Sequence, residues 1–287
     1  MTTLQPSSVA SSAAALPRRR LVYRHALAVR LTHWLNVICL MFLLLSGLQI
    51  FNAHPSLYWG QYGANADQPF IDIGAVRDGD RIRGVTRIGP VSIPTTGVLG
   101  ASSVNGETRA RAFPAWLTLP SYTDLATGRR WHFFFAWLFV INGLAYLIYG
   151  LAAGHFRRDL LPDADQLKPA HLVREIADHA HLRFPKGEAA RRYNALQKLA
   201  YLAVIIVLLP LMVATGLTMS PGMNAAWPWL VDLFGGRQSA RTLHFISASL
   251  IVAFVVVHLV MVLVSGLWNN LRSMITGRFA IDTDRSP

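Results

Sequence analysis

Cysteine is almost absent from this chain, and acidic residues are scarce. Cys39 is the single cysteine among 287 residues, so an intrachain disulfide, a CxxC zinc site and a CxxCH haem-attachment motif are all excluded. Asp and Glu together number 15, against 27 Lys and Arg, and none of the 15 lies in the apolar runs at 28–51, 125–153, 195–219 and 240–266. Any metal cofactor must therefore be held by ligands other than thiolates or intramembrane carboxylates.

Long apolar stretches, by contrast, are abundant, and 53% of the residues are hydrophobic. We predict membrane helices at about 28–51, 122–153, 195–219 and 240–266, because each stretch exceeds the ~20 residues needed to cross the hydrocarbon core. The first stretch follows an arginine cluster but is longer than a signal-peptide core and has no small-residue cleavage site, so we expect a retained helix. The predicted fold class is an all-α integral membrane four-helix bundle.

Two local signals refine these helices. Ser121 and Asp124 form an S-x-x-D capping pattern after Pro120, which predicts that the second helix begins at about 122. Pro210 lies inside the third stretch and is expected to kink or loosen it.

The positive charges lie mainly on one side of the predicted bundle. The net charge of +12 could indicate nucleic-acid binding, but its distribution follows the positive-inside rule instead. Basic residues precede the first helix, fill the loop between the second and third, and follow the fourth; the short loop near 220–239 has Arg237 alone. We therefore expect a multi-pass protein of the bacterial inner membrane with both termini in the cytoplasm, surrounded by lipid and not bound to nucleic acid.

This topology divides the chain into three parts. Residues 1–20 are predicted to be a disordered cytoplasmic tail, 21–280 the membrane domain, and 281–287 a second cytoplasmic tail. Within the domain, 52–121 forms a periplasmic insertion whose Gly, Pro and Thr content indicates short strands and turns.

Four histidines lie within the predicted helices. His244 and His258 are fourteen residues apart, which is ~21 Å along one face of an α-helix. Because the helices alternate in direction, His33 matches His258 in depth on the cytoplasmic side, and His132 matches His244 on the periplasmic side. The histidines thus form two predicted pairs, one near each surface.

Two histidines per level favour axial ligation of haem iron. Zinc would require three or four ligands, and proton relays in membranes usually include Asp or Glu. Arg30 on the inner side, and Arg130 and Arg241 on the outer side, could pair with haem propionates or serve as interfacial anchors. Small residues suited to packing against a porphyrin are Ser46, Gly47, Gly143, Gly216, Ser247 and Ser249.

The sequence also resembles a known family. The segments RLTHWLNVICLMFLLLSGLQI and RTLHF, with a second histidine fourteen residues later, resemble helices of the bacterial cytochrome b561 and hydrogenase/formate dehydrogenase cytochrome b superfamily. GRRWHFFFAWLFVINGLAYLIYG most resembles the thiosulfate reductase-type cytochrome b subunits. The likeness covers about residues 21–280.

The resemblance implies two b haems, with His33 and His258 on the inner iron and His132 and His244 on the outer iron. It implies electron transfer between the quinone pool and a periplasmic oxidoreductase subunit containing molybdopterin, with this chain as the electron-transfer subunit and not the catalytic one. Related bundles bind quinone beside the inner haem. Asn194 and Gln197 have about that depth, although they could equally be a helix cap.

Two other functions remain open from the sequence. One is a stand-alone haem b quinone reductase that oxidises superoxide or another small donor at the outer haem. The other is a transporter whose histidines carry protons.

Overall fold

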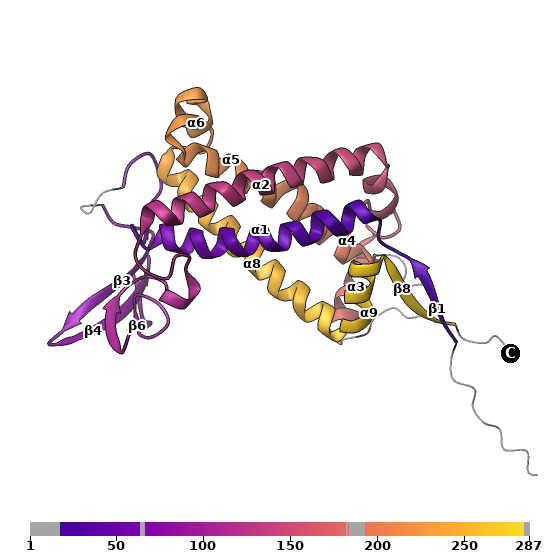
Figure 1. Cartoon of the computed structure of the whole chain (residues 1–287), viewed down its shortest axis with the longest axis horizontal. Helices are drawn as coiled ribbons and strands as arrows, with labels where there is room; N and C mark the ends of the chain where they lie inside the picture. The colour runs from indigo at the N-terminus through magenta and orange to yellow at the C-terminus, as the bar shows by residue number, and fades with distance from the viewer. Residues whose placement is uncertain (1–17, 64–66, 182, 184–192, 284–287) are drawn as a thin grey trace, which may run out of the picture.

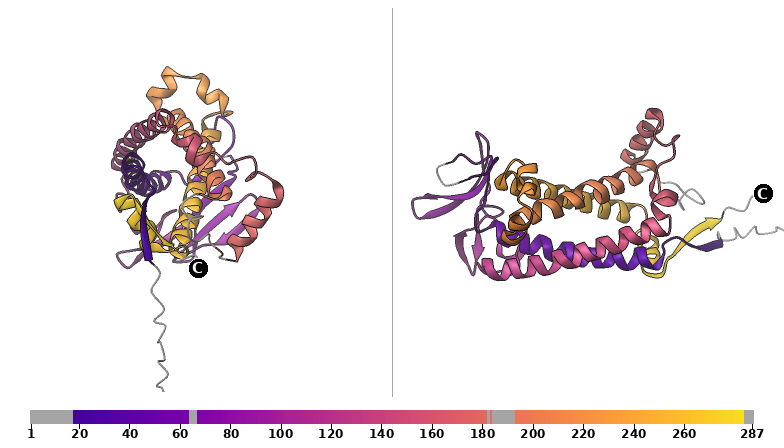
Figure 2. Two further views of the ribbon diagram at one scale, coloured as in Figure 1. Left: turned by 90° about the vertical axis from the view of Figure 1, so that its right-hand side faces the viewer. Right: turned by 90° about the horizontal axis from the view of Figure 1, so that it is seen from above.

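Four long helical spans form the body of the molecule in the computed structural model, which describes residues 18–63, 67–181, 183 and 193–283. The spans are α1 (Leu27–Phe51), α2 (Leu125–Ala152), a third span (Ala195–Met219) and α8 (Arg237–Val264), and all are long and apolar enough to cross a membrane. They run along the long axis of the molecule (Figure 1). In the right-hand view of Figure 2, α1 and α2 form one layer and the other two spans form the second. The four predicted helical spans are confirmed, although the chain is mostly helical and not all-α, because the described residues also form three small sheets.

The third span is divided into three pieces. It consists of α4 (Ala195–Leu202), a π-helical segment η4 (Ala203–Leu208) and α5 (Leu209–Met219). Pro210 has no backbone N–H to donate to the carbonyl four residues earlier, at Ile206, and its ring crowds that carbonyl. Ile206 lies in η4, so the expected loosening takes the form of a π segment.

The second span begins later than the predicted residue 122. Asp124 is the N-cap of α2, and its side chain accepts a hydrogen bond from the Thr127 amide at 3.0 Å. The predicted capping role of Ser121 is therefore wrong, because Ser121 lies outside the helix. The Ser121 carbonyl accepts from the Arg111 guanidinium, and the Tyr122 carbonyl accepts from the Gln49 amide. Both carbonyl groups therefore accept hydrogen bonds from residues outside α2.

The two ends of the described chain pair with each other. Strands β1 (Arg18–Tyr23) and β8 (Arg278–Thr283) form an antiparallel ladder, and Val22, Phe279 and Ile281 make a small core there. The predicted tails are therefore too long, since residues 18–20 and 281–283 are in strands, while 1–17 and 284–287 lie outside the described residues. The pairing is between segments far apart in sequence, so no local pattern could indicate it.

We call this part of the molecule the terminal end. It also contains the π segment η2 (Phe156–Leu160), α3 (Pro169–Ala180) and α9 (Leu267–Thr276). In Figure 1 these elements gather around the β1–β8 ladder, at the opposite end of the bundle from the strands of the 52–121 segment.

The 52–121 segment forms the other end, which we call the insertion end. A four-stranded antiparallel sheet has the order β2 (Ser56–Leu57), β3 (Ile71–Asp78), β4 (Arg81–Ile88) and β5 (Val91–Pro94). The hairpin β6 (Ala101–Val104) and β7 (Glu107–Ala110) and the short helix η1 (Ala115–Leu117) follow. Two short helices, α6 (Pro221–Ala226) and α7 (Trp229–Leu233), connect the third span to α8.

The insertion is packed onto the spans. Leu57, Ile73 and Phe113 share a core with Phe51 at the end of α1. The first turn of α8 also depends on the insertion, because the Gly60 carbonyl accepts from the Gln238 and Ser239 amides. These contacts satisfy amides that a helix N-terminus leaves without intrahelical partners.

Arg111 connects three parts of the insertion end. Its guanidinium donates to Gln49 Oε1 of α1 at 2.7 Å, to Thr118 Oγ1 at 2.6 Å and to the Ser121 carbonyl at 2.6 Å. Burial lowers the pKa of Arg111, although it remains charged at neutral pH. Gln49 itself is only 1% exposed.

Replacing Arg111 with alanine should destabilise the protein by about 2 kcal/mol, because Gln49 Oε1 would be left buried without a donor. Arg109→Ala is the matched control, since Arg109 pairs with Glu107 on an exposed hairpin and such pairs contribute little. Thermal unfolding in detergent should give a clearly lower Tm for Arg111→Ala alone. Equal Tm values for the two variants would contradict the role of Arg111.

Candidate functional site: two pairs of histidine rings

One pair of histidines lies toward the insertion end. The ring centroids of His132 and His244 are 6.4 Å apart, with an interplanar angle of 62°. Each histidine lies seven residues after the first residue of its helix, which is Leu125 in α2 and Arg237 in α8. We call this the insertion-end pair.

The Nδ1 atoms of this pair have matching partners. His132 Nδ1 lies 3.1 Å from Ser46 Oγ on α1, and His244 Nδ1 lies 3.1 Å from Thr215 Oγ1 on α5. Each hydroxyl donates to the carbonyl four residues earlier at 2.6 Å, so it can accept from the ring. An Nδ1–H donated in this way leaves each Nε2 free of a proton and able to bind a metal.

A glycine lies beside each ring of the insertion-end pair. A Cβ added at Gly47 would come 3.3 Å from His132 Cε1, and one at Gly216 would come 3.3 Å from His244 Cε1. The same additions at Gly143 would meet nothing within 4 Å, and Ser249 is exposed. Only part of the predicted set of small residues therefore borders the rings.

The second pair lies toward the terminal end. The ring centroids of His33 on α1 and His258 on α8 are 6.4 Å apart, with an interplanar angle of 73°. His33 stacks on Trp34 at 5.3 Å, and His258 stacks on Phe254 at 6.0 Å. The Tyr201 ring of α4 is 6.5 Å from His258. We call His33 and His258 the terminal-end pair.

Both ring spacings fit two imidazoles on opposite faces of one haem iron. Metal–imidazole bonds are ~2 Å long, so two axial rings have centroids roughly 6 Å apart. Among the described residues, no group of three or more His, Cys, Asp or Glu could hold a metal ion. The donor set at each level is therefore two imidazoles from different helices.

The predicted propionate arginines differ in their surroundings. Arg241 donates to the Ser56 carbonyl at 2.7 Å and to the His54 carbonyl, and its guanidinium lies 5.4 Å above the Phe51 ring. Arg30 donates to the Ile275 carbonyl of α9, while Arg130 is exposed near the start of α2. Arg241 and Arg30 thus join segments of the protein, and their pairing with propionates stays a prediction.

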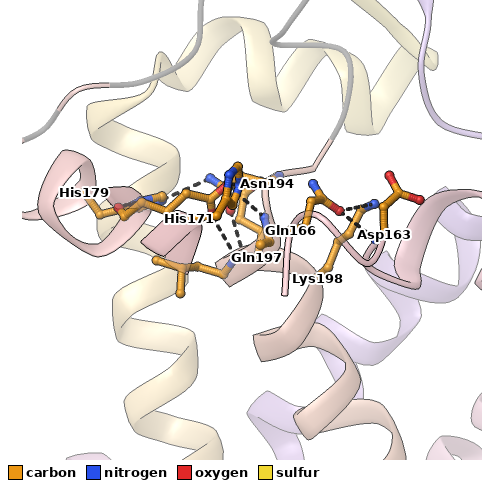
Figure 3. Close-up of polar contacts among 10 residues, drawn as sticks. Asp163, Gln166, His171, His179, Asn194, Gln197 and Lys198 are labelled. Carbon is orange, nitrogen blue, oxygen red and sulfur yellow. Dashed lines mark hydrogen bonds and ion pairs between the residues drawn. The ribbon is translucent and has the colours of Figure 1, made fainter. Parts of the chain in front are cut away.

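Asn194 and Gln197, the predicted quinone residues, form the cap of α4. Asn194 Oδ1 accepts from the Gln197 amide at 2.8 Å, and Gln197 Oε1 accepts from the Asn194 amide at 3.4 Å. Glu175 of α3 accepts from two further amides of this turn, and Lys198 donates to Gln166 at 3.0 Å (Figure 3). Asn194 and Gln197 thus cap α4, and Asn194 Nδ2 also lies 3.1 Å from His179 Nε2 of α3.

Sequence reasoning missed the residues that contact the rings. Thr215 and Tyr201 were not predicted, and Ser46 was predicted only as a small packing residue. A signal was present, because Ser46-Gly47-Leu48 on α1 and Thr215-Gly216-Leu217 on α5 repeat the same pattern. In both helix pairs, α1–α2 and α5–α8, the hydroxyl lies beside Nδ1 and the glycine beside Cε1 of the histidine on the partner helix.

Comparison with known proteins agrees with this geometry. Residues 24–277 match the family described as prokaryotic cytochrome b561. A curated relative, the putative protein-methionine-sulfoxide reductase subunit YedZ1 of Azospira oryzae, is 28% identical over 234 residues, covering 82% of this chain and 87% of its own. No solved structure matches the sequence.

Proposed function

This chain belongs to the prokaryotic cytochrome b561 family of haem-binding membrane electron-transfer proteins, and we propose that it is a di-haem subunit that moves electrons across the inner membrane. The observation that carries the proposal is the pair of 6.4 Å ring spacings, one toward each end of the bundle. The haem irons would supply the one-electron chemistry. The chain's own residues would hold each iron and orient its ligands.

The distribution of charge supports one orientation. Basic residues concentrate at the terminal end, so this end faces the cytoplasm by the positive-inside rule. The terminal-end pair His33 and His258 then holds the inner haem, and the insertion-end pair His132 and His244 holds the outer haem. Fourteen residues of α8 separate its two ligands, which is ~21 Å along the helix axis.

The insertion supports a periplasmic partner. In this orientation it projects outward, and it exposes large aromatic side chains that are enriched in protein interfaces: Trp59, Tyr62 and Trp116. The relative named above is described as a reductase subunit. We therefore assign the flow of electrons from membrane quinol, through the inner and then the outer haem, to a periplasmic molybdopterin-containing reductase.

Purified protein should show the visible spectrum of b haem, and a quinol analogue such as menadiol should reduce both haems. The reduced haems should be reoxidised by the periplasmic partner and should stay reduced without it, because the terminal reaction belongs to that catalytic subunit. Haem content, stopped-flow absorbance and co-purification from native membranes provide the measurements. A featureless spectrum would contradict the haem proposal. Efficient oxidation of superoxide by the isolated chain would favour the stand-alone enzyme.

A further inference from the structure

A series of ring side chains extends from the inner-haem ligand His258 to the terminal end of the bundle. Tyr201 of α4 lies 6.5 Å from His258, and Tyr193, just before α4, lies 5.5 Å from Tyr201. The Tyr193 hydroxyl is 3.4 Å from Nδ1 of His25. His25 is in the connection between β1 and α1, and it is 8% exposed.

His25 and Tyr193 are both neutral at neutral pH. Burial, together with the charge of Arg24, lowers the pKa of His25 to about 4. Burial also raises the pKa of Tyr193 well above its usual range. The contact is therefore an O–H group donating to an imidazole nitrogen, with the other imidazole nitrogen, Nε2, carrying the ring proton. Such a pair can accept a proton at the tyrosine oxygen and release one from Nε2.

The positive groups around His25 disfavour its charged form, so a proton that reaches the ring is released again and not held. Positive groups lie on either side in the chain: Arg24, whose guanidinium is 5.4 Å from the Tyr193 ring centroid, and Arg30 on α1. His155 before η2 also disfavours a charged His25. The nearby carboxylate of Asp159 is paired with His155, at 2.7 Å, and not with His25.

We propose that His25 and Tyr193 are the proton-exchange pair for the quinol that reduces the inner haem. This inference rests on the proposed function, and specifically on its quinone half. It assigns the proton transfer to residues other than Asn194 and Gln197, whose polar groups serve the cap of α4.

The chemistry balances over two rounds. In each round the quinol loses one electron, for which a ferric haem held by His33 and His258 would be the acceptor, and one hydroxyl proton, which moves to the Tyr193 oxygen. At the same time the Tyr193 proton moves to His25 Nδ1, and the Nε2 proton leaves for cytoplasmic water. Before the second round Nε2 takes up a proton as Nδ1 releases one, which restores the starting tautomer with no net change in protons. A second haem, held by His132 and His244, would take the first electron onward before the second round. One quinol thus becomes one quinone, with two protons released to the cytoplasm and two electrons sent outward.

The test is stopped-flow reduction of the ferric haems by menadiol in the full-length purified protein. His25→Asn and Tyr193→Phe should each slow the reduction on the order of a hundredfold, the range typical of lost acid–base catalysis. Because both residues serve one step, the double variant should be little slower than the slower single variant. His181→Asn, an exposed histidine of the same end, is the control and should keep the original rate.

Dithionite separates this role from a structural one. It bypasses quinol chemistry, so it should reduce all variants equally and give unchanged haem spectra. In heavy water, menadiol reduction of the unmodified protein should slow at least about twofold while dithionite reduction does not, a result that needs no variant to fold. Unchanged menadiol rates in both variants, or no isotope effect, would overturn the pair. Failure of menadiol to reduce the unmodified protein would instead reject the quinone half of the proposed function.

Discussion

Replacing His258 with alanine should leave a protein that carries one haem, and replacing His132 should leave a protein that carries the other. His258 faces His33 across a ring spacing of 6.4 Å, and His132 faces His244 at the same spacing. Removing one ring therefore removes half of the donor set at one level without touching the other level. Pyridine haemochrome assays should fall from two haems per chain to one in each variant, and redox titration should show which midpoint potential is lost.

The pairing of the histidines makes a stronger prediction than the number of haems that each variant keeps. His33→Ala should lose the same haem as His258→Ala, and their double variant should still keep one haem. His132→Ala with His244→Ala should behave likewise for the other haem, while His181→Ala should keep both. If His33→Ala and His132→Ala lost the same haem, or if each single variant lost both or neither, the assignment would be wrong.

Replacing Gly47 with valine should displace the outer haem. A Cβ at this position already lies 3.3 Å from His132 Cε1, and the added methyl groups of valine would push the ring away from its iron. Gly216→Val should act in the same way on His244. Alanine at either position should have a smaller effect, because the neighbouring ring need move only a few tenths of an ångström. Haem content and the midpoint potential of the outer haem provide the measurements.

Gly143→Val is the matched control, since an added Cβ there meets nothing within 4 Å. It is also a glycine inside a membrane-spanning helix, so a general effect of valine on helix formation would appear in all three variants. Equal loss of haem in Gly47→Val and Gly143→Val would show that the close approach of Gly47 to the ring is not the cause. An intact outer haem in both Gly47→Val and Gly216→Val would lead to the same conclusion.

The spans and the histidines were predictable because their signals are local. A membrane helix is specified by about twenty consecutive apolar residues, and α1 and α8 begin and end within three residues of the predicted bounds. The depth of a histidine follows from its position in the helix and the direction of that helix. The match of His33 with His258 therefore follows from the amino-acid sequence alone.

Polar side chains near the helix ends were not predictable in the same way. Arg241, Asn194 and Gln197 each had two possible roles, and for Arg241 the outcome depended on a segment distant in sequence. Arg241 meets the carbonyls of His54 and Ser56 because the insertion folds back onto α8. Asn194 and Gln197 meet each other because α4 begins at Ala195. Sequence spacing specifies where such residues lie, but it does not specify what surrounds them.

The position of α8 has a consequence for biogenesis. It is the last of the four spans to be synthesised, yet it supplies one ring to each histidine pair, and β8, which closes the ladder with β1, follows it. Neither pair can exist until almost the whole chain has left the ribosome. The first three spans must therefore enter the bilayer with His33 and His132 still lacking their partner rings. Two-ring capture of a prosthetic group at either level would therefore have to wait for α8.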